Sequence, residues 1–467
     1  MSKLEPRGAG LHFLDLHPFV RSVVQDKIRG TIVGSALGDC IGLYTEFLSS
    51  KIAHDSYPEG KFQLVHPATA FRYDSHRNKF DMGSWTDDTD HALLILLSYL
   101  HHDGEKLSPQ DLAERLRIWV EQGLRALNRP PLGLGKTVGS VVLDKEYLAD
   151  PVATAHKQWV NSGRKMAPNG SLMRTHPVGI VCLGHDLEKT FQITTAVSVI
   201  THADPRCVVS CCVATGLVRG MLRGDILNET DVDGLIDDAY HWVDAWIRHG
   251  RVDNGTILRD PLLEFEQGEL LDLEEFNKHV RAKTFQELEL DDSMKMGYVY
   301  KCLGAAILSL RMGIRQAPYE MSADFTTTPS SSTVFEKIIT ELTFAAGDAD
   351  TNACVAGALL GCWFGYNSLP AHWRDGMRDL DWLIQKCKGT IYILQKTSGH
   401  SSGYRGSDDP DTRPDGGKGL MNRQELEKRD SDFMMKYMLK HAEGVEQEKK
   451  RLKQNKKNNK LWTGIFG

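Results

Sequence analysis

The stretch Ser84-Trp85-Thr86-Asp87-Asp88-Thr89-Asp90-His91 stands directly before an apolar run over residues 92–100. Thr86, Asp87 and Asp88 bring three oxygen-bearing side chains to the point where a helix is expected to begin. One Thr or Asp is enough to cap a helix, because its side-chain oxygen accepts a hydrogen bond from a free N–H group of the first turn. Two neighbouring carboxylates and a hydroxyl exceed that need. For this stretch alone, helix capping and cation binding both stay open.

A second stretch far along the chain repeats the pattern. Gly347-Asp348-Ala349-Asp350-Thr351-Asn352 precedes another apolar segment, residues 353–365, which is rich in small side chains. Together the two stretches supply four carboxylates and two hydroxyls, an all-oxygen donor set that suits Mg²⁺ or Mn²⁺ rather than zinc. The N-terminus of a helix is the positive end of its dipole and disfavours a bare cation. The carboxylates beyond those needed for capping would offset this repulsion. The pair of stretches therefore predicts a divalent-metal site.

Three further motifs accompany these two stretches. They are Gly34-Ser35-Ala36-Leu37-Gly38-Asp39 with Glu46 after it, Asn169-Gly170-Ser171-Leu172-Met173-Arg174 with Pro177 and Gly179 after it, and Thr201-His202-Ala203-Asp204-Pro205. In their order along roughly residues 27–375, the five motifs resemble those of the ADP-ribosylglycohydrolase family. The resemblance is specific because it rests on five ordered motifs and not on one.

The resemblance implies a binuclear metal site holding two Mg²⁺ ions, with Mn²⁺ as the other ion considered. The metal ligands that it implies are Thr86, Asp87, Asp88, Asp348, Asp350 and Thr351. The candidates for the general acid or base are Asp87, Asp350 and Glu46. Glu46 would reach the metal or its bound water from a movable flap, whereas its local sequence alone favours an ordinary solvated glutamate.

The residues implied to contact the substrate are Asn169, Gly170, Ser171 and His202. The Asn169 loop and the N-terminus of a helix expected over 172–183 would hold a diphosphate, because backbone N–H groups and the helix dipole attract anions. His202 would contact a ribose. Without the resemblance, the loop is a turn that leads into a helix, and His202 is a histidine at a helix end.

The chemistry that the resemblance implies is metal-dependent hydrolysis of the glycosidic bond at C1″ of an ADP-ribose conjugate, with release of ADP-ribose. The expected partner is an ADP-ribose-containing substrate, an ADP-ribosylated protein or a small derivative. Residues 165–168 depart from relatives that carry an extra glycine and an aromatic before the Asn. A hydrolase of the same fold acting on another ADP-ribose-like nucleotide therefore stays open, as does a non-catalytic ADP-ribose-binding or structural protein.

Apolar residues recur at helical spacing along most of the chain, and alternating strand patterns are scarce. The segments with this spacing are 20–40, 93–99, 112–127, 187–200, 208–222, 233–248, 297–312 and 335–346. They predict an all-α fold, an orthogonal multi-helix bundle, which is also the fold that the family resemblance implies.

Composition excludes several classes of protein. The chain has 467 residues, 41% of them hydrophobic and 25% charged, and a net charge of −6, which argues against direct nucleic-acid binding. No apolar run approaches the roughly 18–20 residues of a membrane span, and no secretory signal stands at the N-terminus. Nine cysteines without a Cys-x-x-Cys pair predict reduced core thiols, and hence an intracellular protein, cytoplasmic and/or nuclear.

Three segments are expected along the chain. Residues 1–26 form an N-terminal extension, and 27–397 form the ADP-ribosylglycohydrolase-like catalytic domain with an insertion at about 257–295. Residues 398–467 form a surface loop followed by a charged, basic helical tail. The basic cluster from Lys449 onward suits a solvated helix face, with nuclear import or an acidic partner as the alternatives.

Overall fold

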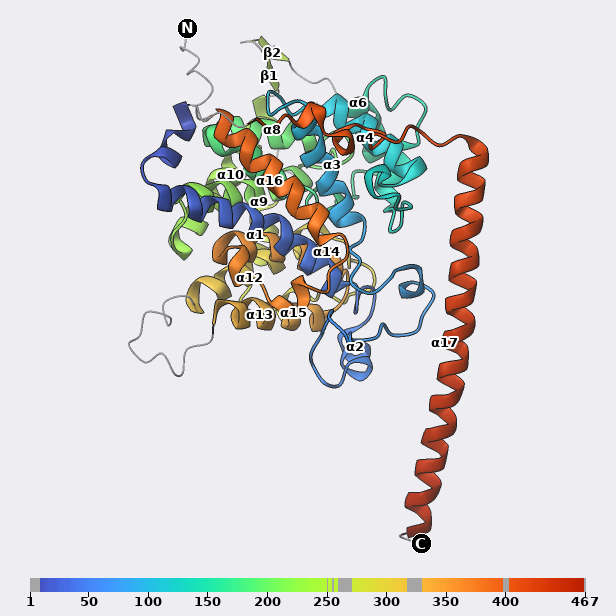
Figure 1. The fold of residues 1–467 in the computed structure, drawn as a ribbon. Helices are drawn as coiled ribbons and strands as arrows, with labels where there is room; N and C mark the ends of the chain where they lie inside the picture. The colour runs from blue at the N-terminus through green and yellow to red at the C-terminus, as the bar shows by residue number, and fades with distance from the viewer. Residues whose placement is uncertain are drawn as a thin grey trace.

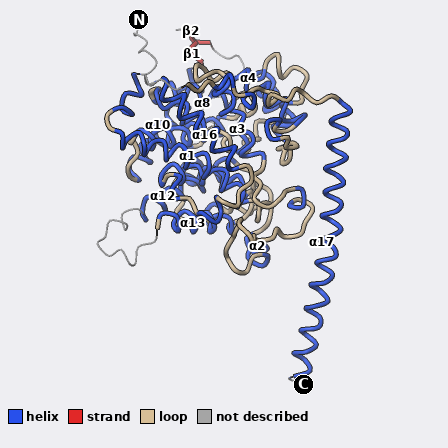
Figure 2. Tube along the Cα trace, in the orientation of Figure 1, coloured by secondary structure: helices blue, strands red, loops and turns tan. Residues whose placement is uncertain are grey.

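Helices build almost all of the regular structure (Figures 1 and 2). The structure is a computed structural model, and it describes residues 9–249, 251–253, 256–258, 271–316, 330–397 and 403–465. The predicted all-α class is confirmed, with one small addition. Strands β1 (Arg251–Asp253) and β2 (Thr256–Leu258) pair antiparallel as a short hairpin.

The helices follow one another with short connections over most of the chain. They are α1 (Pro18–Gly42), α2 (Ser50–Ser56), α3 (Asp87–His101), α4 (Pro109–Gln122), α5 (Lys136–Val142), α6 (Pro151–Asn161), α7 (His176–Val181), α8 (Leu187–Ser198), α9 (Pro205–Arg223), α10 (Glu229–His249), α11 (Leu273–Val280), α12 (Val299–Gln316), α13 (Ser331–Ala345), α14 (Ala349–Phe364), α15 (Ala371–Arg374), α16 (Leu380–Thr397) and α17 (Arg423–Ile465). Local sequence explains several starts: Ser108, Asp150 and Asp204 each cap a first turn and are followed by Pro.

Helices α1 and α14 pack backbone to backbone at the centre of the fold. Glycines recur at every fourth residue of α1, at positions 30, 34, 38 and 42, and so lie on one face of the helix. A Cβ atom at Gly34 would stand 2.5 Å from the carbonyl oxygen of Gly357, and one at Gly38 would collide with the carbonyl of Ala353. This close approach sets Asp39 of α1 beside the first turn of α14, which carries Asp350.

Helix α9 runs through the core and touches α7, α8, α10, α12 and α14. Among the described residues it is the one helix that is long and apolar enough to cross a membrane, which the sequence alone did not lead us to expect. Because 94% of its apolar window is buried inside the protein, α9 serves as a core helix of the bundle.

The structure differs from the expected helix over 172–183. Residues Asn169–Ser171 form a 3-10 turn, and α7 begins only at His176. Asn169 therefore begins a 3-10 turn, and the prediction that a long α-helix begins at Leu172 is wrong, whereas the binding of a diphosphate stays a prediction. Pro177 at the second position of α7 places the helix start, since Pro fits the first turn of a helix and not its interior.

The division of the chain into three segments stays a prediction. Helix α1 crosses the expected boundary between residues 26 and 27. Residues 259–270 of the expected insertion and 398–402 of the expected loop lie outside the described residues. The loop from residue 403 is fastened to the bundle: Lys386 donates to Asp409 at 2.6 Å and to Asp411 at 2.8 Å. In Figure 1, α17 runs past the loops that follow α2 and continues beyond the bundle.

Candidate metal centre

The first turn of α3 presents the acidic stretch to the interior. Thr86 is the N-cap residue, with extended backbone, and its hydroxyl accepts from Asp88 N at 3.4 Å. The same hydroxyl donates to Asp88 Oδ2 at 2.9 Å and lies 3.3 Å from Asp350 Oδ2. Thr86 therefore joins the helix start of α3 to that of α14, across 264 residues of sequence.

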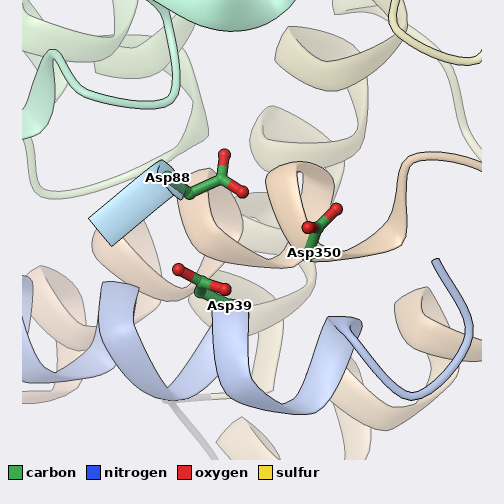
Figure 3. Close-up of side chains that lie close together, drawn as sticks. All are labelled: Asp39, Asp88 and Asp350. Carbon is green, nitrogen blue, oxygen red and sulfur yellow. The ribbon is translucent and has the colours of Figure 1, made fainter. Parts of the chain in front are cut away.

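The carboxylates of Asp39, Asp88 and Asp350 converge from α1, α3 and α14 (Figure 3). They form one group whose oxygens lie within 4.8 Å of one another, and Glu46, Asp348 and Asp350 form a second group by the same measure. All five side chains are buried. Asp350 belongs to both groups, so the two sets of oxygens are contiguous, as adjoining metal positions would require.

Asp39 uses both of its carboxylate oxygens to hold the first turn of α3. Its Oδ1 accepts from Thr86 N at 2.9 Å, and its Oδ2 accepts from Thr89 N at 3.1 Å and from the Thr89 hydroxyl at 2.6 Å. Asp39 therefore caps α3 from another helix. We assign it the role of holding the Thr86–Asp88 turn in place, and not that of a first choice for a metal ligand.

The cluster concentrates negative charge where water is excluded. Burial, followed by the charges of neighbouring carboxylates, raises the pKa of Asp88 and of Asp350 well above the ordinary range. Burial and the charge of Glu46 raise the pKa of Asp348 to about 6. The ion pairs of the described residues give these three aspartates no Lys or Arg partner. Several buried carboxylates without a balancing cation are costly, unless a cation joins them.

The donor set fits a hard divalent metal. Every candidate ligand offers oxygen, and Asp88 Oδ1 is a buried acceptor without a hydrogen-bond partner in the described part of the chain. A buried polar atom normally has a partner, so this oxygen marks a place for one. The buried acidic residues could therefore hold a metal ion, as the sequence led us to expect.

Glu46 is held over the cluster by the loop that follows α2. Its Oε2 lies 2.5 Å from His76 Nε2, and its backbone carbonyl accepts from Arg77 Nη2. Arg77 also donates to Asp74 Oδ2 at 2.7 Å, and Asp74 Oδ1 accepts from the backbone N–H groups of His76 and Arg77. Glu46 is only 5% exposed, so the expectation of an ordinary solvated glutamate from its local sequence is wrong.

Asp87 stands slightly apart. Its carboxylate belongs to neither of the two compact groups, and its Oδ1 lies against Gly133, where an added Cβ atom would collide with it. Gly133 has a positive φ of 92°. Asp87 still adjoins the cluster, because burial and the charges of Asp88 and Glu46 raise its pKa well above the ordinary range.

Of the predicted substrate residues, Asn169 contacts Asp348, whereas the Ser171 side chain lies in the core. Asn169 Nδ2 donates to Asp348 Oδ2 at 2.8 Å. The Ser171 hydroxyl accepts from Ser198 at 3.0 Å and from the Cys211 thiol at 3.4 Å, so its side chain is engaged in the core. A role for Ser171 in binding would therefore fall to its backbone.

His202 presents an unsatisfied nitrogen next to Gly170. Burial and the charge of Arg174 lower the pKa of His202 to about 3, so the ring is neutral. The Thr201 hydroxyl accepts from Arg174 Nη2 at 2.7 Å and lies 2.8 Å from His202 Nδ1, to which we assign its proton. Nε2 then carries the ring proton. It is buried without a partner in the described part of the chain, and His202 is among the residues that line a cavity of about 300 Å³.

Sequence reasoning missed three residues of this centre. Asp39 belongs to a quoted motif, and a lone carboxylate in an apolar helix is a signal that could have identified it. His76 and Arg77 lie in a loop without periodicity, and no pattern in the sequence indicates that they reach Glu46. The two acidic stretches, by contrast, were predicted to meet, and they do.

Comparisons with known proteins identify relatives of this chain. Residues 21–401 match the family described as ADP-ribosylglycohydrolase. ADP-ribosylarginine hydrolase Tri1 of Serratia proteamaculans is 24% identical over 355 residues, 75% of each chain. ADP-ribosylhydrolase ARH3 of Xenopus tropicalis is 26% identical over 375 residues, 76% of this chain and 93% of the relative. A solved ADP-ribosylglycohydrolase-related protein complex matches 81% of this chain and 99% of its own at 18% identity and a TM-score of 0.47. Since the family model spans most of the sequence, this chain belongs to the ADP-ribosylglycohydrolase family.

Proposed function

We propose that this protein is a divalent-metal-dependent hydrolase that cleaves the glycosidic bond at C1″ of an ADP-ribose conjugate and releases ADP-ribose. The observation that carries the proposal is the convergence of two helix starts, those of α3 and α14, on one buried all-oxygen cluster. Family membership adds the substrate class in general terms, and the names of Tri1 and ARH3 are those of hydrolases of such conjugates.

Thr86, Asp88, Asp348, Asp350 and Thr351 are the residues that would hold the metal, with Asp87 and Glu46 at its edge. Mg²⁺ is the ion proposed, with Mn²⁺ as the substitute, in two positions. When bound, such ions would orient substrate oxygens and make water a better nucleophile. The shared membership of Asp350 in both carboxylate groups supports two adjoining positions.

The reaction adds the oxygen of water to C1″, breaks the bond from C1″ to the conjugate and returns a proton to the departing nitrogen or oxygen. Positive charge develops at C1″, and the buried carboxylates stabilise it electrostatically. Glu46, Asp87 and Asp350 are the proposed groups for taking and giving the proton. Burial and neighbouring carboxylates raise the pKa of Asp87 and Asp350 well above the ordinary range, which favours their holding a proton.

On the Asp348 side, His202 and Asn169 would position the ADP-ribosyl group. The His202 Nε2–H is a buried donor beside Gly170, where an added Cβ atom would lie only 3.0 Å from that nitrogen. A phosphate or ribose oxygen can accept from it. Binding energy collected there, away from the breaking bond, fixes C1″ against the carboxylates.

The test is release of ADP-ribose from a panel of conjugates, with and without Mg²⁺. The panel contains Arg-linked, Ser-linked and polymeric ADP-ribose, O-acetyl-ADP-ribose and ADP-ribose phosphates. We expect metal-dependent turnover of at least one, lost in Asp350→Asn and kept in Asp430→Asn, an exposed acid on α17. No turnover of any conjugate, with ADP-ribose still binding in calorimetry, would refute the hydrolase and leave a binding protein.

We also propose an intracellular location, cytoplasmic and/or nuclear. What supports it is that all nine cysteines are free and buried, as expected for a protein that keeps its thiols reduced. Microscopy of the tagged full chain, with compartment markers, tests this proposal directly.

A further inference from the structure

Helix α17 lies outside the part of the chain that matches the family model, yet it is fastened to the loop that holds Glu46. One of its contacts is with Asp81, at the end of that loop. Lys436 Nζ lies 2.9 Å and Lys440 Nζ 2.5 Å from the Asp81 carboxylate, and Arg378 Nη1 reaches the same carboxylate at 2.8 Å. Three cations therefore share one acidic side chain.

The surplus of positive charge surrounds open space. Two cavities of about 600 and 260 Å³ lie between α17 and the loop, and Phe80, Asp81, Arg378, Lys436 and Lys440 line both. The smaller cavity has five cationic side chains, since Lys79 and Arg129 join these three, against the carboxylates of Asp81 and Asp379. Burial raises the pKa of Asp81, but the two lysines outweigh it and lower the pKa to about 2. We call this space the α17 seam.

The α17 seam borders the Glu46 and Asp87 side of the centre. The ring of Phe80 lies 5.8 Å from the ring of His76, which bonds to Glu46. Arg129, Pro130 and Leu132 line the smaller cavity from the loop whose Gly133 lies on Asp87. Asn169 contacts Asp348 instead. The seam therefore adjoins the loops that contact Glu46 and Asp87.

We propose that the α17 seam binds an acidic polypeptide segment, namely the part of an ADP-ribosylated protein that flanks its modified residue. This inference rests on the proposed hydrolase function and specifies its substrate as a protein with acidic residues near the modification. The ion pairs with Asp81 show that the seam's cations already accept one carboxylate from the protein itself, and a glutamate or aspartate of a substrate presents the same group.

The form of the seam favours a polypeptide over a single phosphate. Arg378, Lys436 and Lys440 converge on the Asp81 carboxylate, but Lys79 and Arg129 line the smaller cavity as well, so the positive charge extends beyond that one point. The half-buried aromatic rings of Phe433 and Tyr437 line the smaller cavity together with these cations and offer apolar surface beside them. The chain as a whole has a net charge of −6, whereas the seam is locally positive. Attraction of an acidic partner is therefore confined to the seam.

The first measurement is binding of a fluorescein-labelled, unmodified Glu-rich decapeptide to the full chain, by anisotropy in EDTA. We expect binding that weakens with salt and is about threefold or more weaker in Lys436→Gln. The side chain of Lys436 is 59% exposed and Lys440 still holds Asp81, so this change leaves the fold intact. The matched control is Lys428→Gln, an exposed lysine two turns earlier on α17, which should bind as wild type does.

A second variant distinguishes a peptide-binding site from a set of ion pairs that only hold α17 in place. Asp81→Asn frees the cations from their internal carboxylate, so the peptide should bind more tightly. If the cations serve only to hold α17, the peptide will not bind more tightly and amide exchange at 436–440 will rise. Absence of peptide binding in the wild type, or equal binding in Lys436→Gln, overturns the proposal. Tighter binding of inorganic pyrophosphate than of the peptide overturns it in favour of a phosphate site.

The outcome is independent of the hydrolase assay. If the chain binds the peptide but releases no ADP-ribose, the seam is supported as an acidic-peptide site and the hydrolase function is refuted. If the chain releases ADP-ribose but does not bind the peptide, the hydrolase function is supported and the peptide site is refuted. If the chain both binds the peptide and releases ADP-ribose, Lys436→Gln should raise KM for an acidic ADP-ribosylated peptide without changing kcat. The turnover of free O-acetyl-ADP-ribose should also be unchanged.

Discussion

His76 and Glu46 form a contact of 2.5 Å between Nε2 and Oε2, so a side chain in an irregular loop fixes a carboxylate of the metal centre. We predict that His76→Ala lowers metal affinity or kcat/KM roughly 10- to 100-fold, as is usual when the partner of a metal-site side chain is lost. His76→Asn, which can still donate, should recover part of the loss. The control is His372→Ala, which removes the His of another His–Glu pair, with Glu336 at 3.3 Å. Equal loss in both variants would contradict the role of His76.

Thr89 ties α3 to Asp39 by a charged hydrogen bond of 2.6 Å. Thr89→Val keeps the shape and removes the hydroxyl, so the free energy of unfolding should fall by roughly 1.5–3 kcal/mol, the range for bonds to charged groups. Thr194→Val removes a buried hydroxyl that donates to the helix carbonyl of Thr190, and should cost only about 0.5–1.5 kcal/mol. Urea denaturation measures both. A smaller effect at Thr89 than at Thr194 would argue against Asp39 as an inter-helix cap.

The contact of α1 with α14 makes Gly34 intolerant of a side chain. Gly34→Ala places Cβ 2.5 Å from the Gly357 carbonyl oxygen, so the helices must move apart, and overpacking of this kind costs about 1–3 kcal/mol. Gly234→Ala in α10 meets open space and should stabilise the protein by roughly 0.5–1 kcal/mol. Thermal unfolding of the pair decides the matter: similar midpoints would mean that α1 and α14 are not held by backbone contact.

Stability should depend on pH through His176. Burial lowers its pKa to about 3, from an ordinary value of 6.5. Between these two values the unfolded chain binds a proton that the folded chain does not, so this contribution is complete above about pH 6.5 and is lost as pH falls toward 3. The slope is at most about 1.4 kcal/mol per pH unit. His176→Phe should lower the slope of unfolding free energy against pH between 7 and 5. An unchanged slope would show that the histidine is charged when folded.

Metal should stabilise the fold without any substrate. A ligand that binds only the folded state adds about 2.7 kcal/mol at 100 times its Kd. MgCl₂ or MnCl₂ should therefore raise the melting temperature of the wild type, and EDTA should reverse the rise. Asp88→Asn removes the carboxylate with the unpartnered oxygen and should abolish the effect. Asp430→Asn should retain it. A metal-induced rise that persists in Asp88→Asn would place the metal elsewhere.

The sequence could predict the parts of the site that depend on local pattern. Helix α3 begins at Asp87 and α14 at Ala349, as expected. Such starts can be predicted because a helix start depends on the capping residue and on the apolar residues directly after it in the sequence. The helix expected at Leu172 fails because Pro177 sets the start of α7 at His176. The local sequence of Glu46 predicts a solvated side chain, which is wrong. Its side chain contacts His76 and its backbone carbonyl contacts Arg77, and no local pattern in the sequence connects these residues to Glu46.

Contacts between distant segments were beyond local pattern. The four-residue spacing of small residues in α1 and α14 indicates close packing, but not that these two helices are partners. The docking of α17 depends on Asp81 meeting Lys436 and Lys440, three charged residues among 118 Asp, Glu, Lys and Arg in the chain. Charge alone could not select them.

The packing of α1 against α14 also fixes when the site can exist during synthesis. Gly42 ends α1 and Ala349 begins α14, so roughly 300 residues must be translated between the two partners, which takes about 15–60 s at about 5–20 residues per second. Until then the glycine face of α1 has no partner, and Asp39 and the α3 carboxylates await Asp348 and Asp350. The ribosome therefore releases a chain whose metal centre is among the last parts to be completed, and a nascent chain truncated before residue 348 should bind no metal there.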